Sequence, residues 1–298
     1  MEDLNVFLPE DRYSTILRES DRILLPNNEV GVFVKTAKSI SSVKPSEFVA
    51  KHKLKIPLND SSMSYSIMKD KYYLNSIWTL NNATEFIAST KIGKALYGTL
   101  VGTTSMNPPK AEVAYSILAN PVSNIHIESS VSTYDQAVGC SILIGKLKSS
   151  CFGSELYYLP KGGAGGVSFG FRKTFLSNTF VITYTPIVGQ VSSSIYKPLL
   201  TSNNLKVDFT SRLDANLFSY DSNLRVGFSV DQTINKERSQ QIIASIGHLT
   251  GLSLSYMYKS GSKIPSMCFS LNIPFQWTRT EKFFTQQPTF AVGINLEL

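Results

Sequence analysis

The chain ends in the stretch Thr289-Phe290-Ala291-Val292-Gly293-Ile294-Asn295-Leu296-Glu297-Leu298. Every second residue from Phe290 to Leu298 is apolar, and most of the residues between them are small or polar. Side chains on a β-strand point alternately to opposite faces, so this stretch predicts a strand with one apolar and one polar face. Strands with an apolar outer face and a polar inner face are typical of membrane β-barrels.

The same alternation continues along the chain from residue 29 onward, in short segments separated by turns rich in Asn, Asp, Ser, Gly and Pro. The expected strands lie at residues 30–35, 49–56, 63–68, 72–80, 85–91, 95–103, 111–118, 124–130, 137–146, 149–159, 165–172, 179–185, 190–197, 204–213, 223–231, 240–247, 252–258, 266–273 and 290–297. This gives about nineteen strands, the number in a mitochondrial porin. We therefore predict an all-β fold, a transmembrane β-barrel over residues 29–298.

Composition agrees with a lipid-facing surface. Charged residues make up only 17% of the chain, against about a quarter in soluble domains. No apolar run reaches the roughly eighteen residues of a transmembrane helix, whereas a barrel strand needs only about ten alternating residues. A soluble β-sandwich explains the alternation of each strand equally well. It explains less well a uniform meander of this length without long crossovers, so the barrel is favoured.

Residues 1–28 differ from the rest, and we expect them to form a separate N-terminal segment. Pro9 suits the first turn of a helix and Pro26 ends it. Between them, apolar residues recur at helical spacing: Tyr13, Ile16, Leu17 and Leu24. Charged residues lie mostly on the other faces: Arg12, Arg18, Glu19 and Arg22. This pattern predicts one short amphipathic helix over residues 9–25.

Several functional classes find no support in the sequence. The net charge of +7 is spread over many segments without a basic patch and stacking aromatics, so nucleic-acid binding is not expected. The three histidines, His52, His126 and His248, are isolated, and no metal site is expected. No nucleophile elbow, dinucleotide fingerprint or other catalytic motif occurs, so we expect neither a cofactor nor an enzyme.

Charged residues on the polar faces of the expected strands are candidate pore-lining residues. A charge that faces lipid near the bilayer midplane is costly, so these positions should face inward. The candidates are Lys51, Lys53, Lys55, Lys206, Asp208, Arg212, Arg225 and Asp231. For any one of them, a solvated wall position without a role of its own is the favoured interpretation. Together they would determine what the pore passes.

Two resemblances to mitochondrial proteins follow from short motifs. The last strand resembles the sorting signal of mitochondrial outer-membrane barrels, with Gly293, Leu296 and Leu298 at three defined positions and Ala291 where a polar residue belongs. More of the chain resembles the central barrel of the TOM translocase, the import channel of that membrane. The fragments that carry this resemblance are Arg22-Ile23-Leu24-Leu25-Pro26, Val30-Gly31-Val32-Phe33-Val34-Lys35, residues 48–56, Phe152-Gly153-Ser154-Glu155-Leu156-Tyr157-Tyr158, Leu205-Lys206-Val207 and Val226-Gly227-Phe228.

The second resemblance implies a protein-conducting channel in the outer membrane of the mitochondrion or of a mitochondrion-related organelle, with the N-terminal helix in or near the pore. It also implies partners: precursor proteins with presequences, a receptor, small helical subunits and a second copy of the barrel. A metabolite porin like the voltage-dependent anion channels is the alternative. The Gly-Leu-Lys nucleotide signature of those channels is missing from the chain.

Overall fold

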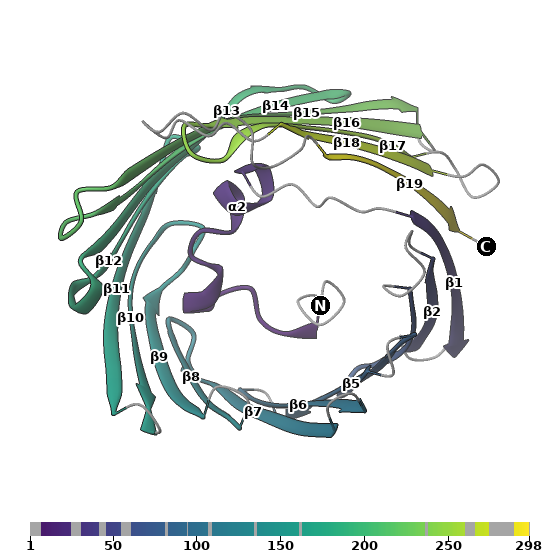
Figure 1. Cartoon of the computed structure of the whole chain (residues 1–298), viewed down its shortest axis with the longest axis horizontal. Helices are drawn as coiled ribbons and strands as arrows, with labels where there is room; N and C mark the ends of the chain where they lie inside the picture. Colours follow the sequence, from purple (N-terminus) through teal and green to yellow (C-terminus); the bar gives the residue numbers. More distant parts are fainter. Residues whose placement is uncertain are drawn as a thin grey trace. The chain divides into compact units, whose positions relative to one another are not determined.

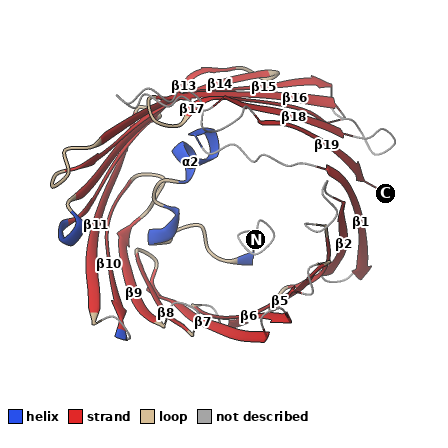
Figure 2. Cartoon of the chain, in the orientation of Figure 1, coloured by secondary structure: helices blue, strands red, loops and turns tan. Residues whose placement is uncertain are grey.

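A computed structural model describes residues 7–24, 31–41, 46–54, 61–80, 83–93, 95–106, 109–133, 136–160, 163–235, 238–259, 266–273 and 289–297. Within this part the chain divides into two compact units. Unit 1 comprises Met1–Thr15, Val32–Phe169 and Glu297–Leu298, and unit 2 comprises Ile16–Gly31 and Gly170–Leu296. Figure 2 shows that strands dominate the described chain and that helical segments are few and short.

The described residues form nineteen β-strands. The first ten are β1 (Gly31–Ser41), β2 (Ser46–Leu54), β3 (Ser62–Lys69), β4 (Tyr72–Thr79), β5 (Ala83–Ile92), β6 (Leu96–Met106), β7 (Pro109–Val122), β8 (Ile125–Ser132), β9 (Ala137–Gly145) and β10 (Ser150–Leu159). The others are β11 (Ala164–Phe175), β12 (Asn178–Thr185), β13 (Gln190–Thr201), β14 (Leu205–Asn216), β15 (Ser222–Asn235), β16 (Arg238–Gly247), β17 (Gly251–Lys259), β18 (Ser266–Ile273) and β19 (Thr289–Glu297).

Within each unit, consecutive strands of the described chain pair with one another. In unit 1, β1 to β10 form successive antiparallel pairs. In unit 2, β12 to β19 do the same. The expected strands and their order are confirmed, and with them the fold class, an all-β chain of the membrane-barrel type (Figure 1).

Apolar side chains are exposed and polar side chains are covered, the reverse of a water-soluble sheet. In unit 2 the register of β14 and β15 pairs Asp208 with Ser229, and both side chains are fully buried. On the opposite face of these strands Leu213 and Leu224 are 42% and 48% exposed. In unit 1 the paired residues Ser66 and Asn75 are likewise buried on β3 and β4. A continuous exposed apolar face of this kind fits a lipid environment.

The N-terminal segment is helical over fewer residues than the predicted 9–25. A 3-10 turn, η1 (Tyr13–Thr15), precedes the α-helix α2 (Arg18–Leu24). The hydroxyl of Thr15 donates to the carbonyls of Glu10 and Arg12 and accepts from the Arg12 amide. These local bonds compete with an α-helical pattern, so Pro9 does not start the helix. A second 3-10 turn, η4 (Pro186–Val188), joins β12 to β13.

Two further findings complete the comparison with the sequence. The final strand β19 pairs with β18, and Val292 lies opposite Phe269, as the alternation predicted. No helix among the described residues is long and apolar enough to cross a membrane.

Two single lysine substitutions on β17 test which face of the sheet meets lipid. Leu254 lies on the exposed apolar face and its neighbour Ser253 on the polar face. We expect Leu254→Lys to destabilise the protein in lipid vesicles by about 2–4 kcal/mol, since a lysine near the midplane must lose its hydration. Ser253→Lys is the matched control and should change the unfolding free energy little. Equal losses in guanidinium unfolding would contradict the assignment of the faces.

Candidate functional site

In unit 2 the helix α2 packs on the polar face of β13, β14, β15 and β16. The apolar side chains Ile23 and Leu24 are 0% and 5% exposed. Gly227 on β15 permits this close approach, because a Cβ at that position would lie 2.8 Å from Cγ2 of Ile23. The helix therefore buries its apolar side against the polar face, or wall, of the sheet. The charged residues on its other sides then need partners of opposite charge.

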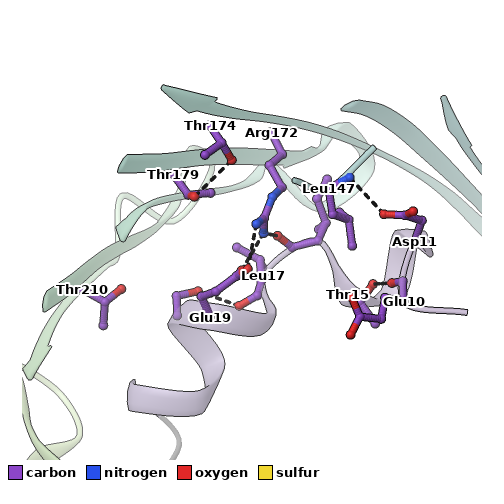
Figure 3. Close-up of polar contacts among 12 residues, drawn as sticks. Glu10, Asp11, Thr15, Leu17, Glu19, Leu147, Arg172, Thr174, Thr179 and Thr210 are labelled. Atoms are coloured by element: carbon purple, nitrogen blue, oxygen red, sulfur yellow. Dashed lines mark hydrogen bonds and ion pairs between the residues drawn. The ribbon is translucent and has the colours of Figure 1, made fainter. Parts of the chain in front are cut away.

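Glu19 forms a two-pronged ion pair with Arg172 on β11 (Figure 3). Nη1 of Arg172 lies 2.6 Å from Oε2 of Glu19, and Nη2 lies 2.7 Å from Oε1. Nη1 also donates to the carbonyl of Ile16, at 3.0 Å. The Arg172 side chain is only 4% exposed. A planar guanidinium that donates two parallel hydrogen bonds to one carboxylate fixes both the position and the orientation of the first turn of the helix.

Asp21 of the helix is the first member of a series of alternating charges that continues on the polar face of the sheet. Its Oδ1 accepts from Nη1 of Arg212 at 2.8 Å, and Nε of Arg212 donates to Asp214, also at 2.8 Å. Asp214 accepts in turn from Arg225 at 2.6 Å and from the hydroxyl of Ser192. Three neighbouring strands thus contribute to one network, in which every charge faces an opposite one.

Arg22 completes the contacts of the helix. Its Nη2 donates to Oδ2 of Asp208 at 2.9 Å, and Nζ of Lys206 lies 2.9 Å from the same oxygen. The Asp208 side chain is fully buried, whereas Arg22 and Lys206 are 46% and 40% exposed. A buried carboxylate is tolerated when cations hold it, so Arg22 offsets the desolvation of Asp208.

The two helix carboxyls have opposite pKa shifts. Burial raises the pKa of Glu19, but the hydrogen bonds and charge of Arg172 outweigh burial, so the net shift is downward. Burial also raises the pKa of Asp21, and the charges of Arg212 and Arg225 do not fully compensate for it. The docked helix therefore favours a charged Glu19 more strongly than a charged Asp21.

In unit 1 the residues before the helix contact the sheet separately. The hydroxyl of Tyr13 lies 2.9 Å from Oγ of Ser168, and the ring covers Gly153, where a Cβ would clash with it. Oδ1 of Asp11 accepts from the Leu147 amide at 3.0 Å (Figure 3). An apolar cluster holds the first described residues: Phe7, Leu8, Tyr73, Tyr97 and Leu118.

Four of the predicted pore-lining residues take part in the ion pairs described above. Arg212 and Arg225 belong to the network of Asp21 and Asp214, and Lys206 and Asp208 belong to the contact with Arg22. Asp231 lies opposite Lys206 in the register of β14 and β15, and its side chain accepts from Gln241 beside a cavity of about 280 Å³. Their role in lining a pore stays a prediction.

The other predicted positions are less fully described. The backbone register places Lys51 and Lys53 opposite Ser64 and Ser62 of β3, but their side chains are outside the described part. Lys55 and Leu298 lie outside the described residues. Gly293 and Leu296 are positions of β19, and their part in sorting stays a prediction.

Sequence reasoning missed Arg172, Asp214 and the pairing role of the helix charges. Arg172 is the last residue of an expected strand. It shares one face of that strand with Gly170, and Phe171 points to the other face. An arginine on the polar face of a strand, together with Glu19 in the expected helix, could have indicated an ion pair between the two. The pairing itself requires the distance between β11 and the helix, which no spacing in the sequence provides.

A charge swap tests the main contact. Breaking a fully buried pair costs about 3–5 kcal/mol, and because Glu19 is 36% exposed we expect about 2 kcal/mol for Arg172→Glu. This variant should free the helix, seen as a mobile signal from a nitroxide at Arg18→Cys in a background without the native cysteines. Combining Arg172→Glu with Glu19→Arg should restore an immobilised label. Failure of the double swap to restore it would argue against direct pairing.

The pH dependence follows from the lowered pKa of Glu19. A group with a lowered pKa stabilises docking fully above its ordinary value of 4.5 and loses this contribution as the pH falls through the shifted value. We expect the same nitroxide to become mobile below about pH 4.5. In Glu19→Gln that transition should vanish, and the raised pKa of Asp21 should leave a weak dependence of opposite sign. A transition unchanged by Glu19→Gln would assign it to another group.

The chain is similar to proteins of one mitochondrial family. The family model "Mitochondrial distribution and morphology protein 10" matches residues 80–250, more than half of the chain. A protein of that name from Meyerozyma guilliermondii is 33% identical over 99 residues, which are 30% of this chain and 23% of the relative. One from Debaryomyces hansenii is 31% identical over 110 residues, 34% of this chain and 22% of the relative.

The chain thus aligns with less than a quarter of the length of these curated relatives. The expected membrane is confirmed, whereas the matching family is not specifically the import channel that the motifs resembled. The chain belongs to the family Mitochondrial distribution and morphology protein 10 and is a β-barrel-type protein of the mitochondrial outer membrane.

Proposed function

We propose that this chain acts in mitochondrial distribution and morphology, as the name of its family states for its relatives, and that it does so as a non-catalytic membrane barrel. The supporting observation is the helix α2 held on the polar face of unit 2 by three ion pairs. Because three charged residues of the helix are paired with charges of the wall, the helix occupies a fixed position on this face.

Depletion in living cells tests this proposal. We expect mitochondria to change shape and distribution before the import of presequence-bearing precursors declines. The control is re-expression of the unaltered chain, which should restore normal shape. A fall in import that precedes any change of shape, with distribution normal throughout, would contradict the proposal.

A protein-conducting channel is the second candidate. One observation favours it: Asp208 already accepts a bond from Arg22 on an amphipathic helix. Presequences are basic amphipathic helices, so one of them could take the place of α2 on this carboxylate. This candidate would bring with it the partners that the resemblance implied: a receptor, small helical subunits and a second barrel.

Reconstituted channels separate the second candidate from a metabolite porin. If the wall carboxylates receive presequences, a cationic presequence peptide should block conductance. Replacement of Asp208 and Asp231 by Asn and of Glu297 by Gln should weaken that block, most clearly at low salt, where charges are less screened. Nucleotide flux without peptide block would favour the metabolite porin. If the reconstituted protein does not conduct at all, both channel functions are excluded and only the role in mitochondrial morphology remains.

A further inference from the structure

Two lysines lie on the mostly apolar exposed face of β11 to β14 in unit 2. Along β11, Phe171 and Phe175 are 40% and 65% exposed while Arg172 between them is buried, so Lys173 belongs to the exposed face. On β13 the exposed neighbour of Lys197 on that face is Ile195, 49% exposed. Strand positions on this face carry no acidic residue in the described part of unit 2.

The strand register places the two lysines on either side of β12. Leu176 and Ser177 form a two-residue turn with φ of 46° and 68°, and the hydroxyls of Thr174 and Thr179 lie 3.2 Å apart. Lys173 is therefore opposite Phe180 of β12. Phe180 is opposite Ile195 of β13, and Lys197 is two residues further toward the hairpin end. Adjacent strands are about 4.8 Å apart, so roughly 10 Å separates β11 from β13.

The surface around the lysines combines a polar part with an apolar part, as an amphipathic ligand requires. Asn178 of β12 lies between them at the hairpin end. Toward the middle of the strands the exposed face is apolar, with Phe180, Ile182 and Ile195 at 41%, 37% and 49% exposure. No described carboxylate pairs with Lys173 or Lys197. Long lysine stems can lie along such a surface while the ammonium groups reach the headgroup level.

We propose that Lys173 and Lys197 bind the phosphate headgroup of an acidic phospholipid, whose acyl chains lie along Phe180 and Ile195. The site rests on the membrane location of the chain and is independent of the proposed function. Basic residues near the ends of membrane-spanning segments attract anionic lipids. The Cα atoms of the two lysines are about 12 Å apart, from two strand spacings and an offset of two residues, so their long side chains can contact one headgroup from both sides.

A lipid explains this surface better than an acidic protein segment. Each lysine lies near the hairpin end of its strand, where a long stem can pass the exposed Phe175 and Leu176 to the headgroup level. From the lysines, exposed apolar side chains extend toward the middle of the strands. A ligand that matches both parts has phosphate at one end and hydrocarbon at the other. Lys146 and Lys148 offer a contrast in unit 1, because they lie in the turn between β9 and β10 and are exposed without facing such rows.

Lipid retention in nanodiscs of mixed neutral and acidic phospholipid tests the proposal. Native mass spectrometry should show an acidic phospholipid retained by the unaltered protein and by the control variant Lys146→Gln/Lys148→Gln. Retention should fall about tenfold or more in Lys173→Gln/Lys197→Gln, and Lys173→Arg/Lys197→Arg should keep it. Equal retention by the two glutamine variants, whether high or low, would overturn the site.

A second measurement uses the unaltered protein and does not depend on the folding of a variant. An acidic phospholipid with a photoreactive acyl chain should label peptides that contain Phe180 or Ile195, and a neutral lipid with the same chain should label them much less. A soluble glycerol phosphate should not compete, because it lacks the chains. Competition by glycerol phosphate, or cross-links at these residues to a protein and to no lipid, would reject the phospholipid assignment.

Discussion

The ion pair between Glu19 and Arg172 is the contact on which the position of the N-terminal helix depends. It joins a residue of the first helical turn to a buried guanidinium of β11 through two short bonds, and the same guanidinium also holds the carbonyl of Ile16. Without this contact the buried guanidinium of Arg172 would lose two short bonds to a carboxylate. Helix and wall therefore stabilise each other, since the helix adds ion pairs to those that the strands make among themselves.

The inverted faces of the sheet make such a contact necessary. Lipid accepts only the apolar side of each strand, so the charged residues must collect on the other side, where they need partners. In unit 2 that side holds Asp208, Arg212, Asp214 and Arg225, and the helix contributes Asp21 and Arg22. Lys173 and Lys197 on the apolar face lie two and four residues before the ends of β11 and β13, from where a long stem can carry the ammonium group toward the membrane surface.

Much of this architecture could be predicted from the sequence, because period-two alternation depends only on which face meets lipid. The strands and the polar positions Asp208, Arg212 and Arg225 follow from that rule. The length of the helix did not, since the bonds of the Thr15 hydroxyl are local and leave no periodic signal. The partners of Glu19 and Asp21 lie more than 150 residues away in the chain, and only the folded register brings them together.

Hydrogen exchange of the protein in lipid bilayers tests most directly whether the helix is docked. We expect the amides of residues 20–24 to exchange slowly, with protection close to that of β14 and β15, because helix and wall bury each other. Arg172→Gln should lower the protection of the helix and leave that of the strands unchanged. Fast exchange across residues 16–24 in the unaltered protein would contradict the docked helix and the account built on it.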